Sequence, residues 1–299
     1  MSADYLVTSV ELARIYARAL AIAGGRQRQA SWPRPSAQFS PHRGQGLELH
    51  DLRCYQPGDD VRHIAWRASA RGGPPLVKVF QAERQERCFL VLDQHPGMMF
   101  GTHGSLKAAT AVRCAAVLAF VAIARQSDVG GLVIHPREDV HAYASSIDHA
   151  LALLRAANRL PVQRHWRRIP VADTLERLRR LVGKQAAVYI VSDFLDWGAE
   201  LSPHLLALGD QCELHAVQIF DEGEQQLPAA GQLRLFSPFS GRRYVIDSGD
   251  PGLRQRYGAQ MQARQHQLQA LLHRHGIQHH RVSTEDDFFK ALANVECIL

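Results

Sequence analysis

Hydrophobic residues in the second half of the chain come in short continuous runs, two of which end in an acidic residue. The run at 88–92 ends at Asp93, and the run at 187–192 ends at Asp193. Continuous runs of this length are typical of parallel strands that are buried on both faces. Stretches with the helical period of hydrophobic positions stand between the runs. The alternation predicts an α/β fold built on a doubly wound, mostly parallel sheet.

The same two periods predict the other elements. We expect helices at residues 8–23, 105–126, 146–159, 171–182, 200–208 and 251–275, with a last short helix after 284–286, and strands at 76–80, 129–135, 140–143, 214–220, 233–236, 243–246 and 279–282. Thr8 and Glu11 have the spacing of a capping box at the start of the first helix. Gly24 and Gly25 predict its end.

Composition shifts divide the chain into three parts. Residues 26–46 are rich in Arg, Gln, Pro and Ser and are typical of a linker. We therefore predict an N-terminal helix with its linker at 1–39, a small β-rich subdomain at 40–86, and the α/β domain at 87–299.

Charge and cysteine content limit the kinds of partner and the cellular compartment that we expect for the protein. The 299 residues carry a net charge of +6, which suits an acidic partner without selecting one. The five cysteines are odd in number and form no C-x-x-C motif, so a reducing compartment is expected. No signal-peptide pattern opens the chain. The longest apolar run, 114–124, is shorter than the ~20 residues of a bilayer span. These features predict a soluble, cytoplasmic protein without a membrane span.

The two acids at strand ends have two interpretations. Ligands of open α/β sheets bind at the carboxyl ends of the strands, and paired carboxylates there are suitable ligands for Mg²⁺. Asp93 and Asp193 equally fit a role as caps of the following loops or helices, and the spacing alone slightly favours this second interpretation.

A dense pattern precedes the α/β domain. Its defining positions are Arg53, Tyr55, Pro57, Gly58, Asp59, Asp60, Arg62, Trp66 and Arg71. This pattern closely resembles the signature of the domain of unknown function 58 family, and the similarity extends over about residues 40–295. The charged residues are interpreted as a structural ion-pair network, with a partner-facing surface as the alternative, and Tyr55 and Trp66 are interpreted as core residues.

The resemblance implies a von Willebrand factor A-like domain preceded by a small β-rich segment. It also implies an adaptor or co-chaperone role beside AAA+ ATPases of the MoxR type, and possible contact with other von Willebrand A proteins, without established catalysis. We therefore expect a protein-interaction module that is not an enzyme.

The sequence departs from the metal-binding pattern of von Willebrand A domains, D-x-S-x-S with a later Thr and Asp. Asp93, Thr174 and Asp193 match this pattern, but His95 and Gly97 stand where the two serines belong. Loss of two hydroxyl ligands predicts a degenerate site without a resident cofactor and a metal-independent interface. Weak Mg²⁺ binding and a transition metal held through His95 are the two alternatives.

Three other functions are weighed and disfavoured. A metal-dependent hydrolase would use Asp93 and Asp193 as acid and base. Nucleic acid would contact the arginine-rich segment 164–168. The segment 101–107 lacks the order of a phosphate-binding loop, so Ser105 is predicted to be a helix N-cap instead. The histidines between 273 and 280 are predicted to lie on the surface.

Overall fold

The computed structural model describes residues 6–27, 47–56, 59, 61–69, 74–82, 87–134, 138–159, 169–237 and 241–293. The chain forms two compact units: a small unit, residues 32–85, and a large unit, residues 1–31 together with 86–299. The signature residues Pro57, Gly58, Asp60 and Arg71 lie outside the described residues, as does the side chain of Arg53.

The small unit is built on an antiparallel pair of strands. Its elements are β1 (Leu47–Cys54), η1 (Val61–His63), α2 (Trp66–Ser69) and β2 (Leu76–Ala82). Asp59 accepts a hydrogen bond from the Gln56 backbone N–H (2.9 Å) and so closes a turn. The side chain of Tyr55 is half-buried. The prediction that Trp66 belongs to the core is wrong: Trp66 is 67% exposed at the start of the one-turn helix α2.

The large unit alternates strands and helices as the sequence predicts. Its elements are α1 (Ser9–Gln27), β3 (Arg87–Asp93), η2 (Pro96–Met99), α3 (Lys107–Ala124), β4 (Asp128–Ile134), β5 (Glu138–Ala144), α4 (Ile147–Ala157), α5 (Val171–Leu181), β6 (Ala187–Ser192), η3 (Ala199–Leu201), α6 (Ser202–Gly209), β7 (Glu213–Phe220), α7 (Glu222–Gln225), β8 (Gln232–Phe236), β9 (Arg243–Asp247), α8 (Pro251–Arg274), β10 (Gln278–Ser283) and α9 (Phe288–Ala291).

Within the described residues, this unit holds one sheet of six strands in the order β10-β7-β6-β3-β4-β5. All neighbours are parallel except the edge strand β5, which is antiparallel to β4. The chain runs from β3 to β4 on one side and later returns to β6 on the other side of β3. The strand order therefore reverses at β3 and β6, and such a reversal opens a crevice at the carboxyl ends of the strands.

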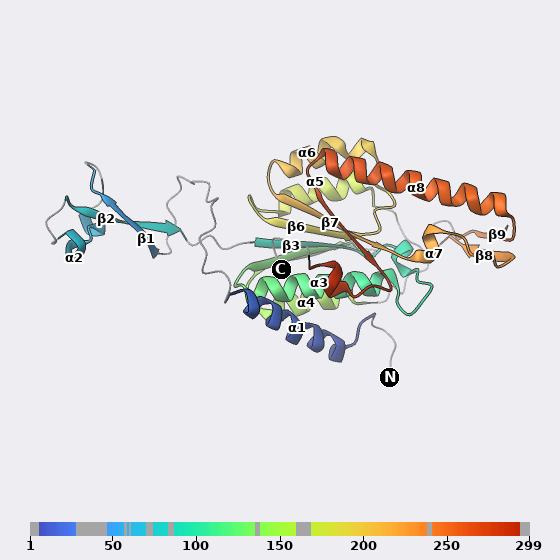
Figure 1. Ribbon diagram of the computed structural model, residues 1–299, viewed down its shortest axis with the longest axis horizontal. Coiled ribbons are helices and arrows are strands. Elements are labelled where there is room, and N and C mark those ends of the chain that lie inside the picture. The colour runs from blue at the N-terminus through green and yellow to red at the C-terminus, as the bar shows by residue number, and fades with distance from the viewer. Residues whose placement is uncertain are drawn as a thin grey trace. The chain divides into compact units, whose positions relative to one another are not determined.

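Helices cover both faces of the sheet (Figure 1). Helices α1, α3 and α4 lie on one face, and α5, α6 and α8 lie on the other. Helix α3 is long and apolar enough to cross a bilayer, and among the described helices it alone is. It is nevertheless a core helix, because nearly all of its side chains are buried against the sheet, α1 and α4.

Hydrogen bonds join helix α1 and the residue Val7 before it to the rest of the large unit. The Val7 backbone N–H donates to Asn158 Oδ1 (2.7 Å), and Asn158 Nδ2 donates to the Val7 carbonyl (2.7 Å). Further along the helix, Arg113 Nε donates to Glu11 Oε1 (2.6 Å). The helix continues to Gln27, so the predicted end at Gly24 is wrong. The Thr8 hydroxyl caps the helix by accepting from the Glu11 N–H (3.2 Å).

Candidate functional site

The carboxyl ends of β3 and β6 bring two acidic residues together, as the sequence pattern predicts. Asp93 is the last residue of β3, and Asp193 directly follows β6. The Ser192 hydroxyl donates a hydrogen bond to Asp93 Oδ2 (2.8 Å) and so links the two strand ends. Burial raises the pKa of Asp93, although the nearby His95 counteracts part of this effect. The site therefore lies where the strand order reverses.

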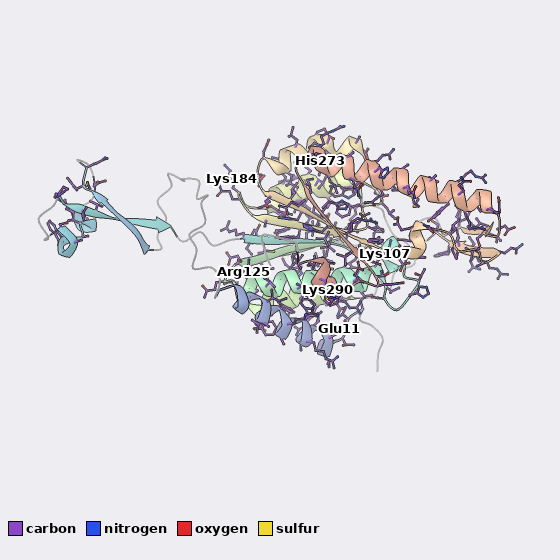
Figure 2. The ribbon with its side chains drawn as sticks, viewed as in Figure 1. Glu11, Lys107, Arg125, Lys184, His273 and Lys290 are labelled. Carbon is purple, nitrogen blue, oxygen red and sulfur yellow. The ribbon has the colours of Figure 1, made fainter. Side chains whose placement is uncertain are left out.

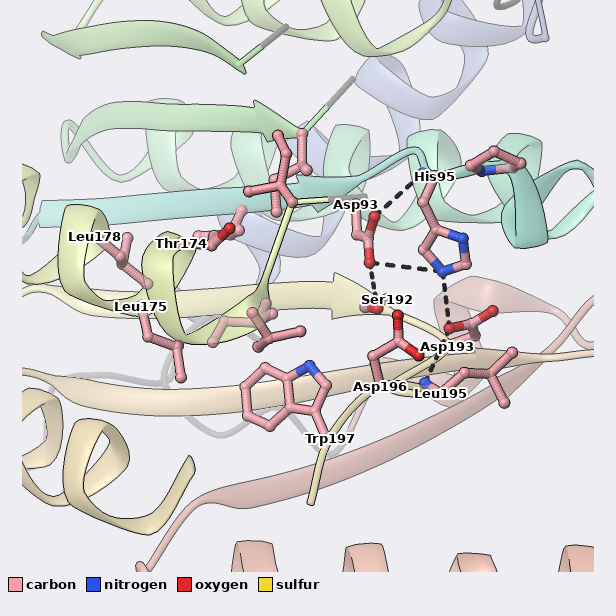
Figure 3. A pocket seen from close by; sticks show the side chains of 16 residues that line it. Asp93, His95, Thr174, Leu175, Leu178, Ser192, Asp193, Leu195, Asp196 and Trp197 are labelled. Carbon is pink, nitrogen blue, oxygen red and sulfur yellow. Dashed lines mark hydrogen bonds and ion pairs between the residues drawn. The ribbon is translucent and has the colours of Figure 1, made fainter. Parts of the chain in front are cut away.

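His95 bridges the two acids (Figure 3). Its Nδ1 accepts the Gly97 backbone N–H (2.8 Å), so the proton of the neutral ring lies on Nε2. Nε2 donates to Asp193 Oδ1 at 3.0 Å and lies 3.7 Å from Asp93 Oδ2. Burial alone would lower the pKa of His95, but the hydrogen bond to Asp193 and the charges of both acids raise it.

Lys107 lies at the start of α3, at the opposite end of the sheet from Lys184 (Figure 2). Its side chain is fully buried, and the ammonium donates to Asp193 Oδ2 (2.8 Å) and to Glu224 Oε1 (2.7 Å). Burial would lower the pKa of Lys107, but the two carboxylates raise it. Burial would raise the pKa of Asp193, but the hydrogen bond from His95 and the Lys107 ammonium hold it well below its usual range.

The two departures from the expected metal-binding pattern are one structural change. A Cβ atom at Gly97 would lie 2.4 Å from His95 Cε1, which no real contact allows. The ring of His95 occupies its place only because residue 97 has no side chain. A serine at position 97 is therefore incompatible with this position of the His95 ring.

Thr174 lies on α5 and lines the same pocket as Asp93 and Asp193. It is 6% exposed, and its hydroxyl makes no hydrogen bond among the described residues. The structure thus brings all five predicted site residues to one strand edge, although no group of three or more His, Cys, Asp or Glu in the described part of the chain has an arrangement suited to a metal ion.

A third acid fixes the loop beside the site. Asp221 follows β7 and accepts hydrogen bonds from the Thr102 N–H (3.0 Å), the Thr102 hydroxyl (2.6 Å) and the Thr284 hydroxyl (2.8 Å). It also accepts from the Gly223 N–H (2.9 Å) and so caps α7, which carries Glu224. Burial would raise the pKa of Asp221, but the hydrogen bonds from Thr102 lower it.

Two residues of this centre were missed from the sequence. Lys107 follows the family resemblance and ends the segment 101–107 that lacks the order of a phosphate-binding loop, but neither feature predicts an ion pair, and Glu224 belongs to no motif. A charged residue at the start of an otherwise apolar core helix was the available signal, since a buried charge requires a partner. The prediction that Ser105 caps α3 is wrong, because Leu106 takes the N-cap position without a side-chain bond.

The other sequence candidates contribute little to this site. His275 Nε2 bonds to Ser202 Oγ (3.0 Å), and His279 Nε2 bonds to Gln218 Oε1 (3.0 Å). His279 and His280 are half-buried on β10 instead of on the open surface. The arginine-rich segment 164–168 lies outside the described residues.

The sequence matches a known family. The model of the family described as protein of unknown function DUF58 matches residues 51–267. Uncharacterized proteins from Mycobacterium bovis and Mycobacterium tuberculosis are 31% identical over 214 residues, which is 71% of this chain and 66% of those proteins. The chain therefore spans slightly less than two thirds of the length of these relatives.

Three solved structures align with this chain at low similarity. They are the conserved hypothetical protein BatB from Bacteroides thetaiotaomicron (13% identity, TM-score 0.45), an aerotolerance-related membrane protein from Bacteroides fragilis (12%, 0.43) and an uncharacterized membrane spanning protein from Vibrio fischeri (11%, 0.25). Each alignment covers 71% of this chain and 98% of the other.

The cytoplasmic location expected from the sequence is corrected by this comparison. Two of the three structures are membrane proteins by name. Composition and the absence of a signal pattern were too weak a basis for a location, and the expectation is withdrawn.

Proposed function

The chain belongs to the family of proteins of unknown function DUF58, and from this premise we propose that it is a non-catalytic protein-interaction module whose contact face is the Asp93 edge of the sheet. The observation that carries the proposal is the position of Lys107. A buried ammonium, held by Asp193 and Glu224, supplies the positive charge that a metal ion would otherwise bring to these carboxylates.

We propose in addition that the large unit is a degenerate von Willebrand factor A-like domain. Asp93, Thr174 and Asp193 gather at one pocket, which supports this assignment. Asp193 is already engaged by Lys107 and His95, so a divalent ion would have to displace the buried ammonium. Displacement would leave a buried cation unpaired, which costs about 3–5 kcal/mol. Partner binding without a metal follows from this cost.

The proposed partner is an AAA+ ATPase of the MoxR type, which is the partner that the family resemblance implies. Phe100, at the end of η2, is 40% exposed beside the Asp93 edge and offers an apolar contact. Aromatic side chains are enriched in the centres of protein interfaces. We therefore place Phe100 in the contact face.

The hydrolase alternative has less support. A pair of acids acting as general acid and base must reach a substrate, and Asp193 is 5% exposed and turned to Lys107 and His95. Asp93 accepts from Ser192 and from the His95 backbone N–H. These hydrogen bonds hold both carboxylates in place, and Asp193 is too enclosed to act with Asp93 as an acid–base pair.

The test is a pull-down of the tagged protein from a lysate of its own cells, with and without EDTA, read by mass spectrometry. Equal capture of a AAA+ ATPase in both samples is the expected result. Phe100→Ser should reduce the captured amount, whereas Leu206→Ser should not, because Leu206 is exposed on α6, away from this edge. If EDTA abolishes the capture, the proposal that Lys107 replaces a metal ion is wrong. If no AAA+ ATPase is captured in either sample, the proposed partner is wrong.

A further inference from the structure

A small pocket opens beside Asp93 on the α5 face of the sheet (Figure 3). Its volume is ≈ 70 Å³. A water molecule needs about 10–15 Å³ in such a cavity, so the pocket holds several waters or the end of one side chain, and a nucleotide is too large for it. The apolar walls come from β3, β4, β6, α5 and the segment after β6, through Val91, Ile134, Leu175, Leu178, Ile190 and Trp197.

Two polar groups of the pocket, the Asp93 carboxylate and the Thr174 hydroxyl, offer hydrogen-bond acceptors. Asp93 retains 17% exposure of its side chain, and a carboxylate accepts more hydrogen bonds than the two it receives from Ser192 and the His95 backbone. The Thr174 hydroxyl is almost fully buried against the pocket and makes no hydrogen bond among the described residues. Both groups can accept from a donor that enters the pocket.

Negatively charged side chains outnumber positively charged ones beside the pocket. Three carboxylates, those of Asp93, Asp193 and Glu224, surround the Lys107 ammonium and the His95 ring. Lys107 has no exposed side-chain surface and cannot meet an incoming group. An acidic group would therefore face the carboxylates of Asp93 and Asp196, with only the partly exposed His95 ring to offset them.

A purely apolar group would match the apolar walls of the pocket but not its polar groups, Asp93 and Thr174. It would remove water from Asp93 and from Thr174 without replacing the hydrogen bonds of that water, and a buried polar group without a partner is unfavourable. A lysine or arginine side chain meets both demands, since its aliphatic stem contacts apolar walls while its charged end donates hydrogen bonds. Trp197 adds an indole ring, the aromatic side chain that attracts cations most strongly.

We propose that this pocket receives a lysine or arginine side chain of the protein partner. The inference rests on the proposed interaction function and names the chemistry of its contact. The pocket would therefore bind a positively charged side chain, whereas a metal ion at this edge would attract a negatively charged one.

The experiment uses three blocked tripeptides that differ only in the central residue: lysine, norleucine or glutamate between two glycines. Each is titrated into the ¹⁵N-labelled full chain at equal ionic strength, and the indole N–H signal of Trp197 is followed by NMR after assignment with Trp197→Phe. The lysine peptide should shift this signal saturably and at least tenfold more tightly than the norleucine peptide, and the glutamate peptide should not shift it.

Two variants connect the shift to the pocket. Asp93→Asn should weaken lysine-peptide binding at least tenfold, and Thr174→Val should weaken it by a smaller factor. Asp247→Asn, an exposed acid on β9, is the matched control and should bind as the unmodified chain does. Thermal unfolding of each variant shows that it is folded.

Equal binding of the norleucine and lysine peptides, a shift with glutamate, or no shift with any peptide would overturn the inference. The lysate capture is independent of these titrations. If a AAA+ ATPase is captured but the lysine peptide does not bind, the basic contact is wrong while the interaction function stands. If no AAA+ ATPase is captured, that partner is wrong whatever the peptides do.

Discussion

The Lys107 ammonium lies 2.8 Å from Asp193 Oδ2, and both side chains are almost completely shielded from water. A buried ion pair of this kind contributes modestly when intact but is costly to break, because the remaining charge has no partner. Glu224 on α7 completes the arrangement. Three separate elements, α3, the end of β6 and α7, are thus tied together by one ammonium group.

Replacing Lys107 by Met should destabilise the protein strongly. The change leaves Asp193 and Glu224 without their cation, and we expect a loss of about 3–5 kcal/mol in the free energy of unfolding, measured by urea denaturation. Lys184→Met is the matched control: Lys184 is exposed, so its loss should stay within about 0.5 kcal/mol. Similar values for the two variants would show that the buried pair is not a stabilising contact.

Mg²⁺ should leave the stability of the folded protein unchanged. A ligand that binds only the native state raises Tm, and the stabilisation grows with ln(1 + [L]/Kd). Because Lys107 and His95 already engage Asp193, we expect the same Tm in millimolar Mg²⁺ as in EDTA, measured by differential scanning calorimetry. A rise of several degrees in Mg²⁺ would mean that the ion displaces the ammonium.

The contribution of His95 to stability should depend on pH. Its pKa is raised in the folded protein, so the folded state holds the proton more tightly than the unfolded chain does. This contribution is fully present below the unfolded pKa of about 6.5 and is lost as pH rises through the raised folded pKa. The difference in free energy of unfolding between wild type and His95→Asn should therefore shrink as the pH rises above about 6.5. A constant difference over this range would refute the assignment.

Gly131 in β4 should not tolerate a side chain. A Cβ atom there would lie 2.7 Å from the two methyl groups of Leu153 on α4 and 3.0 Å from the Leu90 carbonyl oxygen on the neighbouring strand. Gly131→Ala should cost about 1–3 kcal/mol, as overpacked core positions do. Gly258→Ala in α8 meets no atom within 4 Å and should stabilise the helix by about 0.5–1 kcal/mol. Urea denaturation of both variants measures the contrast.

Most of the fold was predictable because its signals are local. The continuous apolar runs at β3, β6 and β7 and the helical period of α4, α5 and α8 lie within single elements, and the structure confirms them. The exposed Trp66 was mispredicted because its burial depends on neighbours distant in sequence. Glycine is only a weak stop signal, and α1 continues past Gly24 to Gln27.

The site was predictable only in part for the same reason. The acids at the strand ends predict that the site lies at the carboxyl edge of the sheet. His95 and Gly97 show from the sequence alone that the two serine hydroxyls of the metal-binding pattern are missing. The buried ion pair at the site joins Lys107 and Glu224, which are separated by 117 residues and carry no motif. Pairings of this kind follow from the topology and cannot be deduced from residue spacing.

The contact between Val7 and Asn158 also sets an order of events during synthesis, because 151 positions separate the two residues. Helix α1 leaves the ribosome well before α3 and α4, the helices that cover it. At a synthesis rate of about 5–20 residues per second, the apolar face of α1 stays uncovered for roughly 8 to 30 s before residue 158 is made. During that interval the nascent chain presents an unpaired amphipathic helix, which is the kind of surface that chaperones bind.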